Sequence, residues 1–553
     1  MEDKLQEIQS IISDLDKVLI EEPFVVDHEA NAVGKVNVIY NDKNDSLSFT
    51  VKIRPEYPFK ILNTEAITFI NSELLKYGHV MGDGSICIHT SHSFDLKKKL
   101  EIDFASLKRW IQRYFVNKEK DEHYEHIIMQ PLKYNEQHYS FIFSEIEHEF
   151  RRDDFGFFDY AEIHSGVFYD TKINNQIVIN FKDKHNKLIE TSKWSSAYTN
   201  LSPANIRFGL YIFIEQPPVI QHRFIISNWR DLQDKVPDEF FTFLYGLQRN
   251  NQKLKEVPIP LMVGYKISET EIHWQTTMLQ FDNFPIGHEK INQKWVGFFT
   301  DTKIDWIMTK NSSYDYFFGR GKFNNEISNA KVLIIGTGAI GSMVATTLVR
   351  GGCKSIDILD FDIKEPENVC RSEYAFSNGI TNKVDELKEI LSSISPFVEI
   401  RIMDSKFFHL HTKIFNNAQD LKSLKKGLNE YDLIFDCSTD NDLMYILSQL
   451  SLNKIITLSI TNNARALVCG AQSNHYVWVM NQYENVLQNE IEDVYNPTGC
   501  WSPTFKASYN DISVLVQYAL KHINVKLGQG KELRNFVIET DETNGFHSKL
   551  VEF

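Results

Sequence analysis

Apolar and polar positions in the first 155 residues follow the helical period and the strand period in turn. Residues 5–19 place apolar side chains three and four positions apart, which predicts one amphipathic helix. Alternation at every second position predicts strands at 36–40 and 47–53, joined by a polar turn at 41–45. A further strand is expected at 66–70, and helices at 104–116 and 141–150. The pattern predicts an α+β domain over residues 1–155.

The pattern changes over residues 156–305. Aromatic and β-branched runs, such as 176–181 and 208–214, favour strands. Pro217 and Pro218, and later Pro258 and Pro260, interrupt the chain. No cluster of catalytic residue types is found there, so this region is predicted to be a mixed, strand-rich linker domain.

Residues 306–553 alternate short apolar runs with helical segments. Strands are expected at 332–335, 356–359, 433–435 and 455–458. This alternation is typical of a parallel, doubly wound, Rossmann-like sheet. A chain of 553 residues has room for three or four domains, at roughly 150 residues each. The fold class predicted for the whole chain is therefore α/β multidomain.

Charge and composition exclude several functional classes. Lys and Arg total 59 and Asp and Glu total 74, so the net charge is 59 − 74 = −15, whereas a general nucleic-acid binder needs a basic face. The chain has no apolar run of about 18 residues and no basic-then-apolar start, so we expect a cytoplasmic protein without a membrane partner. Six scattered cysteines without a Cys-x-x-Cys pair argue against disulfides and a structural zinc.

A glycine-rich motif follows the predicted strand at 331–335. Gly336, Gly338 and Gly341 form a G-x-G-x-x-G pattern between a strand and a helix. The first glycine permits a tight turn, the second lets a phosphate approach the backbone, and the third lets the helix pack closely. Asp360 ends the next strand and can accept a hydrogen bond from a ribose hydroxyl. This motif alone predicts a nucleotide site, and a dinucleotide dehydrogenase is the default interpretation.

Polar residues downstream change that interpretation. They form an ordered series that consists of Asp362, Asn368, Arg371, Lys383 and Asp440. Over residues 315–525 this order resembles the ThiF-type adenylation domain of ubiquitin-activating enzymes and of bacterial sulfur-carrier relatives. The resemblance implies Mg-ATP as the ligand in place of NAD.

The resemblance also implies a role for each polar residue. A C-terminal carboxylate would attack the α-phosphate of ATP, with Arg371 and Lys383 facing the phosphoryl oxygens where negative charge develops. Asn368 would donate to a phosphate oxygen, and Asp440 would bind Mg²⁺. Arg320 matches an arginine that reaches the neighbouring subunit's site. The structural alternatives are a helix cap for Asn368, a surface charge for Arg371 and a solvated side chain for Arg320.

Cys500 is the first candidate nucleophile. It lies in the run Asn496-Pro-Thr-Gly-Cys500, where proline and glycine predict a loop. Thioester-forming activating enzymes carry their catalytic cysteine on such a loop, so the resemblance implies that Cys500 attacks the acyl adenylate and releases AMP. A structural loop cysteine is the alternative.

Cys87 is the second candidate, at the end of a glycine-containing loop. Residues 20–120 resemble a ubiquitin-conjugating enzyme in their helix, strand meander, Tyr57-Pro58-Phe59 run and Ile86-Cys87 pair. This implies that Cys87 accepts the activated modifier, whereas the alternative is a buried apolar cysteine. The His-Pro-Asn run of that family is missing, so its oxyanion-stabilising asparagine is absent. Backbone N–H groups or another side chain must then stabilise the oxyanion. His79, Asp83 and His89 are candidates, with solvated loop residues as the alternative, and the acid or base group at Cys87 stays open.

The order of the two modules resembles the fusion protein of type II CBASS anti-phage operons. This implies a homodimer, and a modifier-like substrate that is the C-terminus of a cGAS-like nucleotidyltransferase. The final acceptor would be a protein lysine or a small-molecule amine. Three alternatives remain, namely a non-catalytic nucleotide-binding scaffold, an adenylating sulfur-carrier or tRNA-modifying enzyme, and a dehydrogenase.

Overall fold

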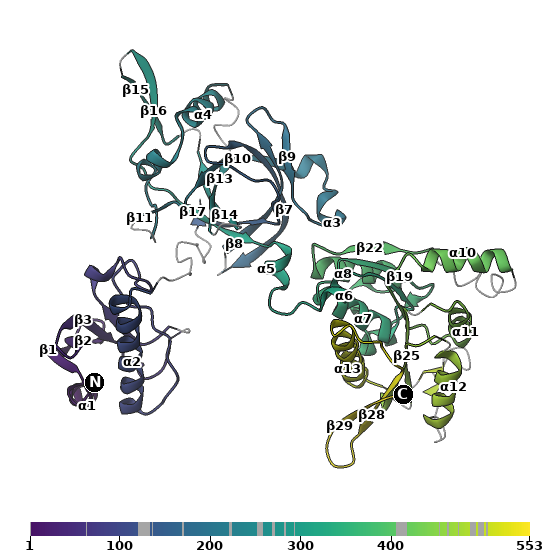
Figure 1. Cartoon of the computed structure of the whole chain (residues 1–553). Coiled ribbons are helices and arrows are strands. Elements are labelled where there is room, and N and C mark those ends of the chain that lie inside the picture. Colours follow the sequence, from purple (N-terminus) through teal and green to yellow (C-terminus); the bar gives the residue numbers. More distant parts are fainter. Residues whose placement is uncertain are drawn as a thin grey trace.

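The computed structural model contains three β-sheet regions in chain order (Figure 1). The residues it describes are 2–61, 64–119, 133–134, 136–168, 171–220, 224–250, 258–267, 271–280, 284–291, 293–404, 417–452, 454–461, 464–473, 475–486, 494–495, 503–504 and 507–553. Within these residues, no helix combines the length and the apolar character that crossing a bilayer requires.

The N-terminal region is an antiparallel meander that packs against two helices. Its strands run in the order β1-β2-β3-β4, and β4 leads into the loop that carries Cys87. The elements are α1 (Glu2–Ser13), β1 (Val18–Val26), β2 (Ala32–Ile39), β3 (Ser46–Ile53), β4 (Ile67–Ile70), the short turn η1 (Ser72–Leu74), α2 (Leu96–Trp110) and the π-helical turn η2 (Ile111–Val116). The predicted strands and the helix at 104–116 are confirmed.

The end of the first helix differs from the prediction. The pattern extended it to residue 19, but α1 ends at Ser13 and Val18 begins β1. Val18 is buried opposite Val38 of β2. Its apolar side chain therefore faces the same core from a strand. An apolar residue at this spacing fits a further helical turn equally well, so the pattern alone does not distinguish the two.

The middle region is a sheet that closes on itself. The nine-stranded order is β5-β6-β17-β14-β13-β10-β7-β8-β9, and an additional pairing of β6 with β8 closes the barrel. The strands of this sheet are β5 (Lys133–Tyr134), β6 (Gln137–Phe143), β7 (Phe155–Phe168), β8 (Thr171–Asp183), β9 (Leu188–Thr191), β10 (Ile206–Glu215), β13 (Ile259–Lys266), β14 (Ile272–Leu279) and β17 (Trp306–Asn311). The closed ring runs from β6 to β8, and β5 and β9 pair outside it. The predicted strands at 176–181 and 208–214 lie within β8 and β10.

Aromatic side chains fill this barrel. Trp274 stacks on Phe181 at 4.8 Å, and Phe150 packs edge-on against Trp274 at 5.2 Å. Helix α4 (Asp238–Asn250) covers a separate apolar cluster outside it. The remaining elements are α3 (Ser196–Thr199), η3 (Pro203–Asn205), η4 (Arg230–Lys235) and the hairpins β11 (Val219–Ile220) with β12 (Phe224–Ile225) and β15 (Ile286–Ile291) with β16 (Lys294–Phe299).

One sequence expectation for this region is corrected. The helix expected at 141–150 is wrong, because β6 occupies residues 137–143 and pairs with both β17 and β8. Phe141 and Phe143 are buried on the barrel side, so an alternating pattern outweighs the helical one. The sheet also takes β5 and β6 from before the expected boundary at 155 and β17 from beyond the one at 305.

The C-terminal region has the Rossmann-like sheet that the sequence predicts, extended by antiparallel strands. The order is β22-β19-β18-β23-β24-β25-β28-β29, parallel from β22 to β24 and antiparallel from there on. The strands are β18 (Lys331–Ile335), β19 (Ser355–Leu359), β20 (Ile363–Lys364), β21 (Thr381–Asn382), β22 (Glu399–Ile402), β23 (Leu433–Asp436), β24 (Ile455–Thr461), β25 (Ala466–Gly470), β26 (Val494–Tyr495), β27 (Pro503–Thr504), β28 (Phe536–Asp541) and β29 (His547–Glu552).

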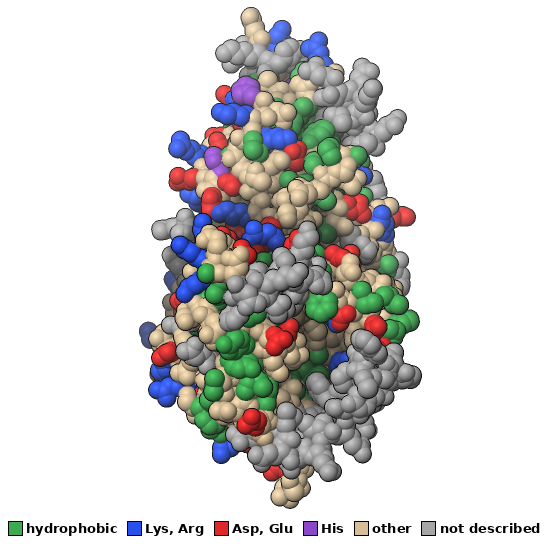
Figure 2. Space-filling view, turned by 90° about the vertical axis from the view of Figure 1, so that its right-hand side faces the viewer, with side chains coloured by type: hydrophobic (Ala, Val, Ile, Leu, Met, Phe, Trp, Pro, Cys, Tyr) green, Lys and Arg blue, Asp and Glu red, His purple; other side chains and the backbone are tan. Residues whose placement is uncertain are grey.

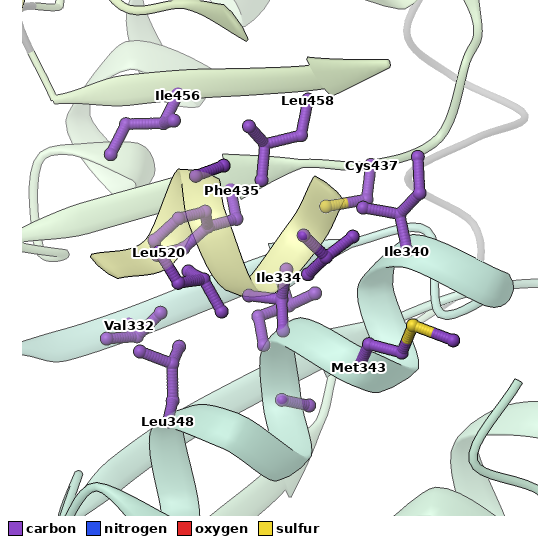
Figure 3. Packing of buried hydrophobic residues seen from close by; sticks show 14 of the residues in the cluster. Val332, Ile334, Ile340, Met343, Leu348, Phe435, Cys437, Ile456, Leu458 and Leu520 are labelled. Atoms are coloured by element: carbon purple, nitrogen blue, oxygen red, sulfur yellow. The ribbon is translucent and has the colours of Figure 1, made fainter. Parts of the chain in front are cut away.

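The helices of this region flank the sheet (Figure 1). They are α5 (Tyr314–Phe318), α6 (Asn325–Ser328), α7 (Ala339–Arg350), η6 (Pro366–Arg371), η7 (Phe376–Asn378), α8 (Lys383–Ile394), α10 (Ala418–Leu428), α11 (Asn441–Gln449), α12 (His475–Val486) and α13 (Tyr509–Gly528). An apolar core lies between β18, β23, β24, α7 and α13, and Ile340 and Cys437 lie side by side at one end of it (Figure 3). This packing fixes where α7 begins relative to the strand ends.

The surface mixes charges of both signs. On the face seen in Figure 2, acidic and basic side chains are interspersed, with groups of hydrophobic side chains among them. Exposed apolar residues of the C-terminal region include Tyr445, Val477 and Phe546.

Candidate active sites

A pocket lies at the carboxyl ends of β18, β19 and β23, where ligands bind in open α/β sheets. Its volume is about 400 Å³. Seven of the predicted site residues line it, namely Gly336, Gly338, Asp360, Asp362, Arg371, Lys383 and Asp440. Ala339, Ile340, Phe361, Cys437, Ser438, Thr439 and Ile460 complete the lining. The pocket therefore combines an apolar wall with cations, carboxylates and a helix N-terminus.

Each of the three positions favours glycine for a different steric reason. Gly336 has a positive φ of +79°, and a Cβ there would lie 2.6 Å from Ser438 Cα. A Cβ on Gly341 would lie 1.9 Å from the Gly336 carbonyl oxygen, so only glycine lets α7 approach the loop. A Cβ on Gly338 would meet nothing within 4 Å. Because Gly338 borders the pocket at the start of α7, its open side leaves room for an anion beside the helix N-terminus.

Asp360 connects the glycine-rich loop to the chain after β19. Its Oδ2 accepts hydrogen bonds from the Thr337 N–H at 2.6 Å and from the Thr337 hydroxyl at 3.1 Å. Its Oδ1 accepts from the Asp362 N–H at 2.9 Å. The carboxylate is thus held at the pocket edge by backbone donors, in the position where the sequence predicts a ribose acceptor.

Two cations approach the pocket from different elements. Lys383 begins α8, and its Nζ donates to Asp362 Oδ2 at 2.5 Å while its side chain is only 10% exposed. Arg371 ends η6 and lines the same pocket. Within the described part of the chain, no carboxylate pairs with Arg371. An unpaired guanidinium in the pocket that also contains the N-terminus of α7 favours a phosphate ligand.

Three predicted residues of the nucleotide site do not line the pocket, namely Gly341, which packs α7 against the loop, Asn368 and Arg320. Asn368 forms a capping box at the start of η6, in which its Oδ1 accepts the Glu365 N–H at 3.0 Å. This is the structural alternative that the sequence left open. Arg320 is exposed, two residues after α5 ends at Phe318, and is not part of the lining. Its expected role in a neighbouring subunit stays a prediction.

A buried ion pair holds the segment that carries Arg371. Lys364 Nζ and Glu386 Oε2 lie 2.6 Å apart, with both side chains 1% exposed. Lys364 also donates to the Ala375 carbonyl at 2.7 Å, and Thr381 donates to Glu386 at 2.6 Å. Burial opposes ionisation of Glu386, but the hydrogen bonds from Lys364, Thr381 and the Ala375 N–H outweigh it and lower the pKa of this carboxyl.

Asp440 begins α11 at the floor of the pocket. Its Oδ1 accepts the N–H groups of Asp442 and Leu443, each at 3.0 Å. Among the described residues, no group of three His, Cys, Asp or Glu side chains is arranged to hold a metal. A single carboxylate that supplements phosphate oxygens and water suits Mg²⁺, which retains several waters in such sites. The residues therefore fit Mg²⁺ only together with a phosphate-bearing ligand.

The sequence interpretation missed a buried polar chain behind Asp440. The Ser438 hydroxyl donates to Asp436 Oδ1 at 2.7 Å and accepts the Asp440 N–H at 3.2 Å. Thr457 donates to Asp436 Oδ2 at 3.3 Å and lies 3.0 Å from His475 Nε2. Burial raises the pKa of Asp436 and lowers that of His475. The position of Asp436 at the end of an apolar strand was the available signal.

Cys87 is half-buried and does not fit the alternative of a buried core cysteine. Ile86 and Ile88 on either side of it are buried, so Cys87 and His89 share the opposite side of the chain. Cys87 Sγ lies 3.7 Å from His89 Nε2. Of the other two candidates, His79 packs its ring on Tyr114 at 4.9 Å, and Asp83 accepts the Ser85 N–H at 2.9 Å.

Cys500 lies outside the described residues, between β26 and β27 in the chain. The remaining cysteines behave as structural residues. Cys353, Cys437 and Cys469 are buried, and desolvation raises the pKa of each thiol. Cys370 is exposed, and its Sγ lies 3.2 Å from the Glu367 carbonyl oxygen.

Comparison with known proteins finds a family match over the part of the chain that contains the pocket. Residues 315–500 match the ThiF family. An ATP-dependent ubiquitin transferase-like protein Cap2 from Enterobacter hormaechei subsp. hoffmannii is 26% identical over 374 residues, which cover 62% of this chain and 60% of that protein. The tRNA threonylcarbamoyladenosine dehydratase 2 of Saccharomyces cerevisiae is 29% identical over 142 residues, which cover 26% of this chain and 30% of that protein.

Among solved structures, E. coli MccB with succinimide is similar at a TM-score of 0.29 and 18% identity, covering 41% of this chain and 65% of that chain. The chain thus spans about 60% of the length of the Cap2 relative and a smaller share of the dehydratase. The matches to Cap2 and to ThiF confirm the resemblance to ThiF-containing proteins of type II CBASS operons. The likeness of residues 20–120 to a conjugating enzyme stays a prediction.

Proposed function

We propose that the chain uses Mg-ATP to adenylate the C-terminal carboxylate of a partner protein and passes the activated acyl group through two cysteine thioesters to an amine. The observation that carries this proposal is the pocket at the carboxyl end of the sheet. It brings the unpaired Arg371, the α8 residue Lys383 and the open flank of Gly338 to one cavity. The match to the ThiF family over residues 315–500 supports the same activity.

The pocket residues suit the adenylation step. A carboxylate oxygen of the partner attacks the α-phosphorus, the bond to the bridging oxygen of pyrophosphate breaks, and pyrophosphate leaves with that electron pair. Arg371 and Lys383 would stabilise the negative charge on the phosphoryl oxygens, and the N–H groups at the start of α7 would add hydrogen bonds. Phe361, which is 62% exposed at the pocket edge, offers an apolar face for the base. Asp440 would hold Mg²⁺, which supplies charge neutralisation when bound.

Two thioester steps would follow. The Cys500 thiolate attacks the carbonyl carbon of the acyl adenylate and AMP leaves; the Cys87 sulfur then takes the acyl group from Cys500. Conjugation ends when an amine, such as a lysine side chain, attacks the Cys87 thioester. The half-exposed sulfur of Cys87 beside His89 supports its part in this sequence.

The partner and the assembly are part of the same proposal. The resemblance to type II CBASS proteins favours a cGAS-like nucleotidyltransferase C-terminus as the adenylated group. A homodimer formed by the C-terminal regions would bring Arg320 of each chain to its neighbour's pocket. Sedimentation of the full chain, with and without ATP, measures the assembly state.

ATP–pyrophosphate exchange tests the first step. We expect exchange that requires the partner C-terminus and Mg²⁺. Arg371→Ala should lower its kcat/KM about 10²-fold, since it removes one charge-stabilising donor. Arg534→Ala removes an exposed arginine away from the pocket and should leave exchange unchanged. Absence of exchange with a bound partner would favour the non-catalytic scaffold.

Intact-mass analysis tests the thioester relay. With ATP, Mg²⁺ and the partner, adducts that dithiothreitol removes should form on Cys500 and on Cys87. Cys500→Ala should abolish both adducts, whereas Cys87→Ala should preserve the adduct on Cys500. An acceptor conjugate that still forms in Cys87→Ala would instead favour a sulfur-carrier or tRNA-modifying type of enzyme.

A further inference from the structure

We infer that His89 is the catalytic base of Cys87, and that a buried ion-pair cluster at Thr90 holds the two side chains together. This inference rests on the proposed role of Cys87 as an acyl acceptor. It concerns the acid or base group beside Cys87, which the sequence leaves open.

The segment places Cys87 and His89 on one side. Ile86 is 4% exposed and Ile88 is 8% exposed, so alternate side chains enter the core. In an extended segment, residues two apart point the same way. Cys87 Sγ and His89 Nε2 accordingly lie 3.7 Å apart, within reach of a hydrogen bond to sulfur. Catalytic hydrogen bonds are often long before substrate binds.

The start of the segment is anchored by the backbone. The Cys87 N–H donates to the His79 carbonyl oxygen at 2.8 Å. The Ile86 N–H donates to the Phe69 carbonyl oxygen of β4, also at 2.8 Å. The backbone at Cys87 is therefore held by β4 and by the segment at His79.

The end of the segment is anchored by buried charges. Thr90 donates its N–H to Glu65 Oε1 at 3.1 Å, and its hydroxyl accepts from Lys99 Nζ at 2.8 Å. Lys99 is 1% exposed and pairs with Glu65 Oε2 at 3.2 Å and with Asp103 Oδ1 at 2.5 Å. An ion cluster at this depth tolerates few geometries, because each buried charge requires its partners. Thr90, Glu65 and Lys99 are thus positioning residues for His89.

The proton of Cys87 moves from Sγ to His89 Nε2 as the sulfur attacks the carbonyl carbon of the Cys500 thioester. A new C–S bond forms at Cys87, and the C–S bond to Cys500 breaks. The electron pair of that bond stays on the Cys500 sulfur, which leaves as a thiolate and recovers a proton from the His89 imidazolium or from water.

The pH dependence of alkylation of the full chain tests this pair. Iodoacetamide modification of Cys87, resolved by peptide mass analysis between pH 5.5 and 9.5, needs neither nucleotide nor partner. His89→Gln preserves size but cannot take up the proton, so the thiol should titrate nearer the ordinary value of about 8.5. We expect the rate at pH 7 to fall about tenfold, which corresponds to one pKa unit. Exposed Cys370 reports alkylation in the same sample, and its rate should not change.

Other titratable groups nearby require matched controls. Those on the surrounding elements are His79, Asp83, His92, Lys60, Glu65, Lys99 and Asp103. His92→Gln removes a neighbouring imidazole that packs on Phe59 and should reproduce the wild-type profile. Thr90→Val removes the hydroxyl that accepts from Lys99. It should shift the pH profile of Cys87 alkylation part of the way toward that of His89→Gln. Thr90→Ser keeps a hydroxyl and should retain the wild-type profile.

A His89→Gln profile that superimposes on the wild-type profile overturns the inference. The relay is judged separately. If Cys87 responds to His89→Gln but never carries an acyl adduct with ATP and the partner, then the pair stands and the proposed function fails. If the acyl adduct forms on Cys87 but His89→Gln leaves the alkylation profile unchanged, the proposed function stands and the inference about His89 is wrong.

Discussion

The hydroxyl of Tyr374 donates a hydrogen bond to the carbonyl oxygen of Thr337 across 2.7 Å. Thr337 is the second residue of the glycine-rich loop, and Tyr374 lies in the segment that follows Arg371. Both residues are buried, and burial raises the pKa of the Tyr374 phenol. This hydrogen bond thus connects the loop before α7 with the segment that follows the unpaired Arg371.

Tyr374→Phe tests this connection. We expect the variant to lose about 1–3 kcal/mol of stability, because a buried carbonyl loses its donor. The KM for ATP should rise several-fold with a smaller change in kcat, since Arg371 is less well placed but still present. Calorimetry and ATP–pyrophosphate exchange measure the two effects. An unchanged melting temperature together with an unchanged KM would show that the bond contributes to neither.

Gly338→Ala and Gly341→Ala form a matched pair. The added methyl at position 338 meets no atom within 4 Å, so stability should change by about 1 kcal/mol or less. The methyl would occupy the open side of the pocket, and ATP affinity should fall at least tenfold. Isothermal titration with ATP and a melting curve distinguish ligand loss from unfolding.

At position 341 the opposite outcome is expected. The methyl would lie 1.9 Å from the Gly336 carbonyl oxygen, so α7 or the loop must move. We expect a loss of about 3 kcal/mol, the upper end of the usual range for overpacked core positions, because the contact is with backbone. A Gly341→Ala protein with wild-type stability would contradict the close contact between the loop and α7.

Asp440→Asn separates the two roles of this side chain. Asparagine caps helices about as well as aspartate, so the melting temperature should stay near wild type. The variant loses the charge, and the Mg²⁺ concentration for half-maximal exchange should rise about tenfold or more. Asp440→Ala should show the same Mg²⁺ effect and in addition cost about 1 kcal/mol from the lost cap. Equal Mg²⁺ dependence in wild type and Asp440→Asn would exclude a metal role.

Lys364→Met tests the buried ion pair. Removal of one partner leaves Glu386 buried without its cation, which costs about 3–5 kcal/mol. The melting temperature of the C-terminal region at pH 7 should fall accordingly. A Lys364→Met, Glu386→Leu double variant should recover part of the loss, because it removes the unpaired charge.

The same pair predicts a pH dependence. The pKa of Glu386 is lowered from 4.5 in the folded protein. Its contribution to stability is therefore present above pH 4.5 and is lost as the pH falls through the lowered pKa. We expect the difference between wild type and Lys364→Met to narrow below pH 4.5 in calorimetry. A difference that stays constant from pH 7 to pH 3 would contradict the pairing.

Local sequence patterns were sufficient to predict much of the secondary structure of the C-terminal region. The runs at 332–335, 356–359, 433–435 and 455–458 are strands, and G-x-G-x-x-G lies between β18 and α7 as its spacing predicts. Such elements are buried on both faces, so their apolar character is visible in a short window. Gly336 and Gly341 could also be interpreted from the sequence, because the motif encodes the turn and the close contact that the structure contains.

The same kind of pattern was misleading where a partner strand decides the conformation. Residues 141–150 have apolar positions compatible with a helix, yet β6 lies between β17 and β8. Those two strands lie far apart in the sequence, and their hydrogen bonds outweigh local propensity. Barrel closure, and with it the extent of the middle sheet, depends on this pairing.

By itself, the sequence determined which elements form around the glycine-rich loop and which residue types could bind a nucleotide. Only the tertiary structure decided that Asn368 caps η6 outside the pocket lining, that Arg371 lacks a carboxylate partner among the described residues, and that His89 is the candidate beside Cys87. The physical reason is that hydrogen bonds and ion pairs depend on distances of a few ångström between side chains. Long-range packing sets those distances, and neither spacing nor composition records them.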